Sequence, residues 1–223
     1  MKKYCFGIDV GGTSVKCGLF TTEGQALDKW EIPTRIQENG KYILPDVAAA
    51  ILKKMEEKNI TAEEVAGVGI GVPGPVNDNG EVPVAVNLHW GHVCIEKDLE
   101  KLTGLKVKAG NDANVAALGE LWKGGAAGRR SMIMVTLGTG VGGGIIVNEK
   151  VIAGAHGAGG EIGHVHVEDA ITDPCNCGNY GCLEQVASAT GIVRLAREEL
   201  EKSQEPSSLR GRHISAKTVF DAV

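Results

Sequence analysis

Short apolar runs alternate with glycine-rich and polar turns along most of the chain, and many of these runs have the length of β-strands. In the first half, apolar runs predict strands at 4–10, 14–20, 26–32, 65–72 and 105–109. The first three runs are consecutive, so they predict a β-meander whose first turn is Gly11–Gly12. The run at 65–72 ends at Pro73-Gly74-Pro75, which stops a strand sharply.

Helical periodicity appears between these strands. After Pro45, an amphipathic helix is predicted whose apolar face carries Val47, Ile51, Leu52 and Met55. Thr61 and Glu64 have the spacing of a capping box. Residues 95–102 and the segment from 112 to about 122 are also expected to be helical, whereas 77–92 is polar and is expected to be a loop.

The second half repeats the opening pattern of strand, glycine turn and strand. Strands are predicted at 131–137 and 142–147, followed by helices at 184–189, 191–202 and after Ser215. The repeat predicts an α/β protein of two similar lobes, with an N-terminal lobe at 1–110 and a C-terminal lobe at 111–223.

Composition places the chain among globular proteins. Of its 223 residues, 43% are hydrophobic and 23% are charged, and the net charge is −5 with lysine and arginine scattered. The absence of a basic stripe argues against nucleic-acid binding, and no apolar run is long enough to span a membrane. The N-terminal apolar run stops at Asp9, unlike a signal peptide, so a cytoplasmic protein with reduced cysteines is expected.

Glycine clusters in the two repeated turns suggest contact between backbone and ligand. The second turn, Gly138–Gly143, matches G-x-G-x-x-G, but a strand-like run follows it where a Rossmann fold needs a helix. Neither turn contains a Walker A lysine. Both instead suggest backbone nests for phosphate, helped by Thr139 in the second turn and by Asp9, a possible Mg²⁺ ligand, beside the first.

Asn111 and Asp112 stand where a strand gives way to a helix. An aspartate at the start of a helix is a routine N-cap, so Asp112 can be an ordinary cap. If a cleft between the lobes lies here, Asp112 is also well placed to act as general base for a substrate hydroxyl, the one carboxylate that phosphoryl transfer needs.

The segment from Glu161 to Glu184 contains a concentrated set of metal ligands. Cys175, Cys177 and Cys182 follow a histidine, either His164 or His166. Three thiolates and one imidazole suit a closed, tetrahedral structural Zn²⁺ site. A disulfide is the main alternative, but nothing in the sequence suggests an oxidising compartment.

Five motifs, taken in order, resemble the ROK family of sugar kinases and repressors. They are Asp9-Val-Gly-Gly-Thr13, Asn111-Asp-Ala-Asn114, Leu137-Gly-Thr-Gly-Val-Gly-Gly-Gly144, Glu161-Ile-Gly-His164 and Cys175-Asn-Cys-Gly-Asn-Tyr-Gly-Cys-Leu-Glu184. Asn87-Leu-His-Trp90 resembles the glucokinase branch of that family. The resemblance implies an actin/hexokinase-like (ribonuclease H-like) two-lobe ATPase fold, a homodimer, and ATP-dependent phosphorylation of a hexose at its 6-hydroxyl, with glucose favoured.

The resemblance also implies a role for each motif residue. Asp112 would be the catalytic base, and the hexose would be bound by Asn111, Asp112, Glu161, His164 and Glu184. Zinc would be held by His164, Cys175, Cys177 and Cys182, which favours His164 over His166. ATP and Mg²⁺ would be bound by Asp9, Gly11, Gly12, Thr13, Gly138, Thr139, Gly140, Gly142 and Gly143.

The chain departs from the family pattern in two respects. The spacer between His164 and Cys175 is longer than expected, and the chain is shorter than family members. We therefore expect an incomplete C-terminal lobe, exposed apolar surface and poor activity for this form. Kinases for N-acetylmannosamine, N-acetylglucosamine or fructose are alternatives, as is a sugar-sensing regulator, although the first strand begins too early to leave room for a helix-turn-helix domain.

Overall fold

The computed structural model describes residues 2–155 and 157–222. The chain divides into two compact units. The first comprises Met1–Arg130 with Ala153–Ala158, and the second Ser131–Ile152 with Gly159–Val223.

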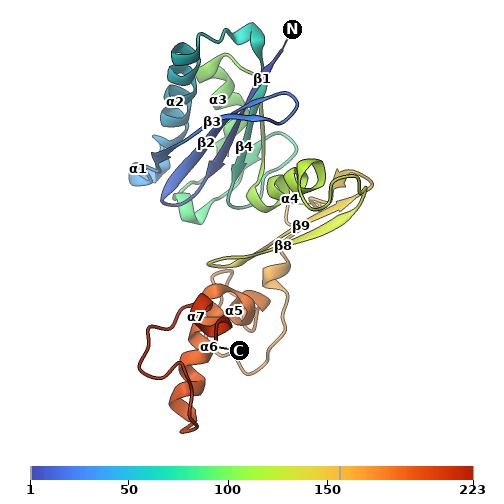
Figure 1. Cartoon of the computed structure of the whole chain (residues 1–223). Coiled ribbons are helices and arrows are strands. Elements are labelled where there is room, and N and C mark those ends of the chain that lie inside the picture. The colour runs from blue at the N-terminus through green and yellow to red at the C-terminus, as the bar shows by residue number, and fades with distance from the viewer. Residues whose placement is uncertain (1, 156, 223) are drawn as a thin grey trace. The chain divides into compact units, whose positions relative to one another are not determined.

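A five-stranded sheet forms the centre of the first unit (Figure 1). Its strands are β1 (Tyr4–Val10), β2 (Ser14–Thr21), β3 (Ala26–Pro33), β4 (Val65–Val72) and β7 (Val107–Asn111). The order is β3-β2-β1-β4-β7, with the predicted antiparallel meander on one side of β1 and parallel β4 and β7 on the other. The polar residue that ends β7, Asn111, therefore lies near the carboxyl ends of β1 and β4.

The helices of the first unit are α1 (Gln37–Gly40), α2 (Ile43–Lys58), α3 (Ile95–Thr103) and α4 (Asp112–Lys123). Helices α2 and α3 pack against each other and lie on one face of the sheet (Figure 1). Each ends at a left-handed residue, Asn59 and Gly104 respectively, a conformation that commonly terminates helices. The short α1 was not predicted.

The predicted apolar face of α2 is largely confirmed. Val47, Ile51 and Met55 are buried, but the prediction was wrong for Leu52, which is 42% exposed. The buried residues of α2 pack with those of the central strands and of α3 in the apolar core. The indole N–H of Trp90 donates a hydrogen bond to the Gly40 carbonyl at 3.0 Å, which satisfies a polar group inside this core.

The first unit extends past the boundary expected at residue 110. Helix α4 contacts β4 and β7, so the segment that follows β7 packs with the first sheet. The expected loop at 77–92 also contains regular structure. It includes β5 (Glu81–Val82), which pairs with β6 (Val93–Cys94), and a 3₁₀ turn at Val86–Leu88. A second 3₁₀ turn, Ala62–Glu64, carries the predicted capping box of Thr61 and Glu64.

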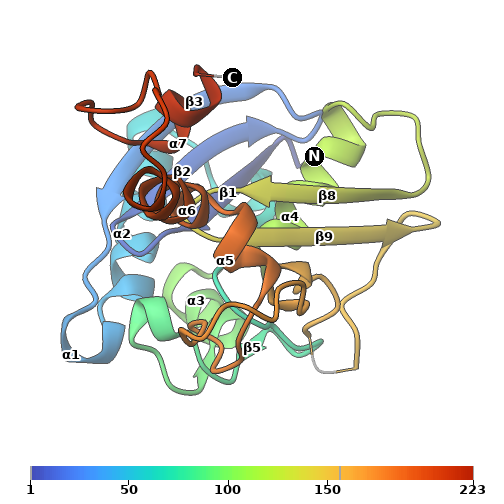
Figure 2. The same ribbon diagram turned by 90° about the horizontal axis from the view of Figure 1, so that it is seen from below.

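The second unit has an antiparallel sheet in the order β10-β9-β8. Its strands are β8 (Met132–Leu137), β9 (Val141–Val147) and β10 (Lys150–Val151), and Figure 2 shows β8 and β9 side by side. A 3₁₀ turn at Ile162–His164 follows, then α5 (Leu183–Ala187), α6 (Ala189–Lys202) and α7 (Ala216–Phe220). Ser215 caps α7 as predicted, since its side chain accepts a hydrogen bond from the Thr218 N–H.

One face of β8 is apolar and poorly covered. Ile133, Val135 and Leu137 are all more than one third exposed, as the sequence led us to expect for part of this lobe. Among the described residues, no helix has the length and apolar character needed to cross a membrane.

The core of the first unit can be tested with two leucines of α3. Leu99 is fully buried and Leu102 is 42% exposed. Leu99→Ala is expected to lower the free energy of unfolding by about 2–5 kcal/mol, because it removes buried methyl groups and leaves a cavity. Leu102→Ala is expected to change it by less than about 0.5 kcal/mol. Urea denaturation measures both, and equal losses would contradict the described packing.

Candidate active site and metal centre

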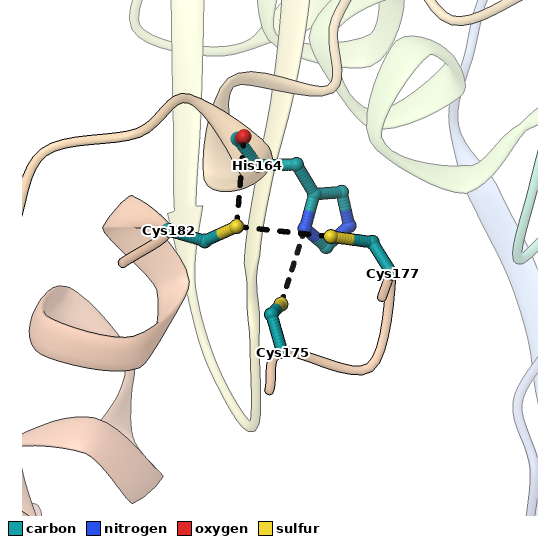
Figure 3. A group of neighbouring side chains, drawn as sticks. All are labelled: His164, Cys175, Cys177 and Cys182. Atoms are coloured by element: carbon teal, nitrogen blue, oxygen red, sulfur yellow. Dashed lines mark hydrogen bonds between the residues drawn. The ribbon is translucent and has the colours of Figure 1, made fainter. Parts of the chain in front are cut away.

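Four side chains of the second unit converge on one point (Figure 3). One donor atom from each of His164, Cys175, Cys177 and Cys182 lies within 4.8 Å of the other three. The Cys175 Sγ is 3.6 Å from His164 Nδ1, and the Cys177 Sγ is 3.7 Å from the Cys182 Sγ. These separations match the edges of a tetrahedron around a Zn²⁺ ion, whose bonds to sulfur and nitrogen are about 2.0–2.3 Å long.

The local chain path explains why the thiols meet. Gly178 and Gly181 both have positive φ, of 89° and 65°, so the chain turns tightly between Cys177 and Cys182. At Gly181 a side chain would also collide with the backbone oxygen of Glu168, 2.0 Å from the position of its Cβ. Cys182 then begins α5 as its N-cap, which fixes the direction of its side chain.

The electrostatics of the three thiols fit a cation at their centre. Burial and the neighbouring thiols raise the pKa of Cys182 to about 12, so this thiol alone would stay protonated at neutral pH. Burial also opposes ionisation of Cys177, but the Asn179 N–H and the neighbouring thiols donate hydrogen bonds that lower its pKa. A bound divalent cation would compensate the cost of several thiolates in one place.

His166 lies outside this group. Its Nδ1 is 2.8 Å from the Tyr180 carbonyl and its Nε2 is 2.7 Å from Asp169 Oδ1. Both ring nitrogens are therefore engaged elsewhere. Of the two histidines that the sequence left open, His164 is the one that lies with the three cysteines. Its other ring nitrogen, Nε2, faces Glu161 Oε2 at 3.8 Å.

Glu184 joins the cysteine loop to the second glycine turn. Its Oε2 accepts a hydrogen bond from the Val141 N–H at 3.0 Å, and its Oε1 lies 3.9 Å from the Cys175 Sγ. At Gly140, a Cβ would lie 2.1 Å from Glu184 Oε2, so a larger residue there would displace this carboxylate. Glu184, predicted as a sugar ligand, thus also positions the turn between β8 and β9.

The same turn is attached to the start of α6. The Ala189 N–H donates to the Gly138 carbonyl at 2.9 Å, and the Thr190 hydroxyl donates to the Thr139 carbonyl at 2.8 Å. A cavity of about 480 Å³ opens beside Thr139, lined by residues of α6 and by Ser215 and Ala216. Arg194 and Arg197 contribute positive charge to its wall, and Glu198, which pairs with Arg194 at 2.6 Å, and Glu201 contribute negative charge.

The first glycine turn is held by Thr34, which directly follows β3, and by the loop around Asn87. The Thr34 hydroxyl donates to the Gly11 carbonyl at 2.6 Å, and the Thr34 N–H to the Thr13 carbonyl at 3.0 Å. A Cβ at Gly12 would stand 3.6 Å from the Asn87 carbonyl oxygen, so this loop packs directly on the turn. Gly12 and Thr13 themselves are exposed, as a phosphate-binding backbone requires.

Asn111 and Asp112 occupy the start of α4. The Asn111 side chain accepts from the Asn114 N–H at 3.1 Å, which makes it the N-cap, and donates to the Gly74 carbonyl at 3.2 Å. The capping role that the sequence allowed for Asp112 therefore belongs to Asn111 instead. Asn114 Oδ1 is buried and has no hydrogen-bond partner among the described residues. A buried polar atom of this kind is costly unless water or a ligand satisfies it.

The surroundings of the Asp112 carboxylate raise its pKa. It reaches solvent, yet the protein atoms crowded around it partly desolvate it and raise its pKa. The negative charge of Asp9 raises the pKa further, while the Ala113 N–H, which donates at 2.7 Å, opposes the shift. A raised pKa makes Asp112 a stronger base than an ordinary aspartate. Asp9 is itself exposed, with Lys16 Nζ at 3.7 Å.

Comparison with known proteins places these features in one family. The sequence profile of the ROK family matches residues 5–223. The chain belongs to the ROK family. This ROK protein is 44% identical over 225 residues to a glucokinase of Halalkalibacterium halodurans, covering 99% of this chain and 68% of that relative. It is 40% identical over 223 residues to a glucokinase of Thermotoga maritima, covering 97% of this chain and 68% of that relative.

Solved structures agree with the sequence comparison. The crystal structure of a ROK family glucokinase from Streptomyces griseus in complex with glucose and AMPPNP matches with a TM-score of 0.74 and 36% identity. The match covers 90% of this chain and 62% of that chain. The predicted α/β, hexokinase-like fold is confirmed by this similarity.

Several residues with a structural part in these sites were missed by the sequence analysis. Thr34 donates to the Gly11 carbonyl, Arg194 donates to the Gln185 carbonyl, and Lys16 Nζ lies 3.7 Å from Asp9. The dual contact of Glu184 was also missed, since Val141 is far from it in sequence. Only the pairing of Asp9 with Lys16 had a signal, because the two residues are opposite each other in the predicted hairpin of β1 and β2.

The influence of Asp9 on Asp112 can be measured directly. Asp9→Asn removes a negative charge beside Asp112, so the pKa of Asp112 is expected to fall toward its ordinary value. Carboxyl-detected NMR titration of the ligand-free protein measures this pKa. Asp98→Asn, on the exposed side of α3, is the control and should leave it unchanged. An unchanged Asp112 pKa in Asp9→Asn would contradict the proximity of the two carboxylates.

Proposed function

We propose that this protein is an ATP-dependent hexose kinase that transfers the γ-phosphoryl group to the 6-hydroxyl of glucose. The observation that carries the proposal is the 44% identity to a glucokinase across 99% of the chain. The raised pKa of the Asp112 carboxylate agrees with it. The chain spans 68% of the length of the first two relatives and 62% of the S. griseus chain.

In the proposed reaction, Asp112 accepts the proton of the 6-hydroxyl as the oxygen attacks the γ-phosphorus. Its raised pKa supports this role, because a stronger base shares more of the proton in the transition state. Asn111 and Asp112 of the first unit and Glu161, His164 and Glu184 of the second are the proposed hexose-binding residues. Their amide, carboxylate and imidazole groups suit the several hydroxyls of a sugar.

The glycine turns are the proposed binding elements for ATP. Gly11, Gly12 and Thr13 offer backbone N–H groups to phosphate oxygens, as do Thr139 and its neighbouring glycines. Mg²⁺ bound with the nucleotide neutralises charge on the transferring phosphoryl group. Asp9 would hold this ion directly or through water, and its carboxylate would then be screened from Lys16.

The proposed role of zinc is structural. The ligand set of three thiolates and His164 Nδ1 leaves no open coordination position for substrate. The ion would fix the backbone that carries Glu161, His164 and Glu184, and leave the chemistry to Asp112.

We also propose, from the family resemblance, a homodimer located in the cytoplasm. Light scattering after size exclusion would test the dimer.

The proposal is tested with a coupled assay against a panel of glucose, N-acetylglucosamine, N-acetylmannosamine and fructose. Glucose is expected to have the highest kcat/KM. A clear preference for one of the other sugars would keep the kinase proposal but overturn its substrate. No turnover of any hexose by the folded full-length protein would overturn the kinase proposal itself.

The base assignment predicts a specific phenotype for Asp112→Asn. The variant is expected to lose about 10²–10⁴-fold in kcat, because the proton acceptor is missing. Because folding raises the pKa of Asp112, its charge costs stability above that pKa. The Tm at pH 7 is therefore expected to be unchanged or higher. A variant with near wild-type kcat would contradict the assignment.

Loss of zinc is expected to affect the sugar more than the chemistry. Cys177→Ser, which changes the exposed ligand, should raise KM for the hexose by a larger factor than it lowers kcat. Cys5→Ser alters a thiol of β1 far from the cluster in sequence, and is the matched control with expected wild-type kinetics. A selective fall in kcat in Cys177→Ser, with KM unchanged, would assign zinc a catalytic role instead.

A further inference from the structure

A second group of potential metal ligands lies in the first unit, on the hairpin of β5 and β6. Glu81 and Cys94 are directly opposed across the two strands, and His92 immediately precedes β6. One carboxylate oxygen, one imidazole nitrogen and one sulfur of these residues lie within 4.8 Å of one another. None of these three residues belongs to the ATP, hexose or cysteine-loop sites described above.

The distances in this group are unlike those of strong hydrogen bonds. His92 Nε2 is 3.7 Å from Glu81 Oε2, which is longer than a hydrogen bond between nitrogen and oxygen. The Cys94 Sγ is 3.7 Å from Glu81 Oε1, a weak S–H···O contact at best. Around a tetrahedral ion with bonds of about 2.0–2.3 Å, however, neighbouring ligand atoms are separated by about 3.3–3.8 Å. The two distances end on different oxygens of the Glu81 carboxylate, so His92 and Cys94 each lie at ligand spacing from that carboxylate, and one donor atom of each residue lies within 4.8 Å of the other two.

We propose that Glu81, His92 and Cys94 form a second divalent-cation site of Zn²⁺ type. Sulfur and imidazole ligands select zinc-like ions over Mg²⁺ or Ca²⁺, which prefer oxygen. Three protein ligands leave one coordination position for water, so this site is open where the cysteine-loop site is closed. The Asn77 amide donates to Glu81 Oε2 at 3.0 Å and orients the carboxylate, as outer partners of metal ligands commonly do.

The site is accessible from solvent. The His92 side chain is 62% exposed and that of Glu81 is 31% exposed, so an ion can enter without unfolding the hairpin. Occupancy would tie β5 to β6 at the base of the segment between them. That segment contains Asn87, whose carbonyl lies against Gly12, and the buried Trp90. A cation at the hairpin would therefore restrict the loop that packs on the first glycine turn.

The test is a cobalt titration of the folded chain carrying one equivalent of Zn²⁺ in the cysteine loop. Co²⁺ bound to a thiolate gives a near-ultraviolet charge-transfer band, which reports Cys94 as a ligand. The band is expected to saturate at one added equivalent and to be absent in Cys94→Ala. His92→Asn, at an exposed position that leaves folding intact, is expected to weaken binding about tenfold or more.

Cys5→Ala is the matched control, because its thiol is on β1 and should leave the band unchanged. Hydrogen exchange gives an independent readout, since amides of 81–94 should exchange more slowly with the ion bound. The proposal is overturned if the wild-type chain shows no thiolate band after zinc loading, or if Cys94→Ala retains it. Unchanged affinity in His92→Asn would also overturn the assigned ligand set.

Discussion

The second unit depends on one constraint, which is that three thiols and one imidazole meet at a single point. Apart from glycines and polar residues, its buried side chains among those described are only Val141, Ile146, Cys175 and Cys182. Two of these four belong to the metal-ligand group, so a conventional apolar core contributes little here. The first unit is the opposite case, because a large apolar cluster holds its sheet and helices together. A cation held by these four residues would do in the second unit what hydrophobic burial does in the first.

Polar contacts connect this ligand group to the proposed phosphate-binding turn and to the proposed hexose-binding residues of the second unit. Glu184 lies in the first turn of α5, just after Cys182, and its carboxylate accepts a hydrogen bond from the Val141 N–H. The cysteine loop and the second glycine turn therefore share this carboxylate. The same turn is bonded to the first residues of α6. On the other side, His164 presents its second ring nitrogen toward Glu161. The proposed sugar ligands and the proposed phosphate turn of this unit are therefore positioned by one connected set of polar contacts.

Much of the fold was predictable, because the spacing of hydrophobic residues and the positions of turn residues mark the strands and helices that the structure contains. The strand predicted at 4–10 is observed at Tyr4–Val10, and the capping box of Thr61 and Glu64 is present. The strand predicted at 105–109 lies two residues later, since Gly104 ends α3 in a left-handed conformation and the chain needs Leu105 to leave the helix. The β5–β6 hairpin escaped prediction because each strand is only two residues long and has no visible period. Among the sites, the convergence of the cysteines followed from spacing, whereas the bond of Glu184 to Val141 depends on tertiary contact alone.

The central claim is that a zinc ion organises the cysteine loop. X-ray absorption at the zinc edge, on protein carrying one equivalent of zinc, tests it most directly because the spectrum reports ligand type and bond length together. The account predicts three sulfur ligands at about 2.3 Å and one nitrogen at about 2.0–2.1 Å. A spectrum dominated by oxygen or nitrogen ligands, or protein that retains no zinc after purification without chelator, would contradict it.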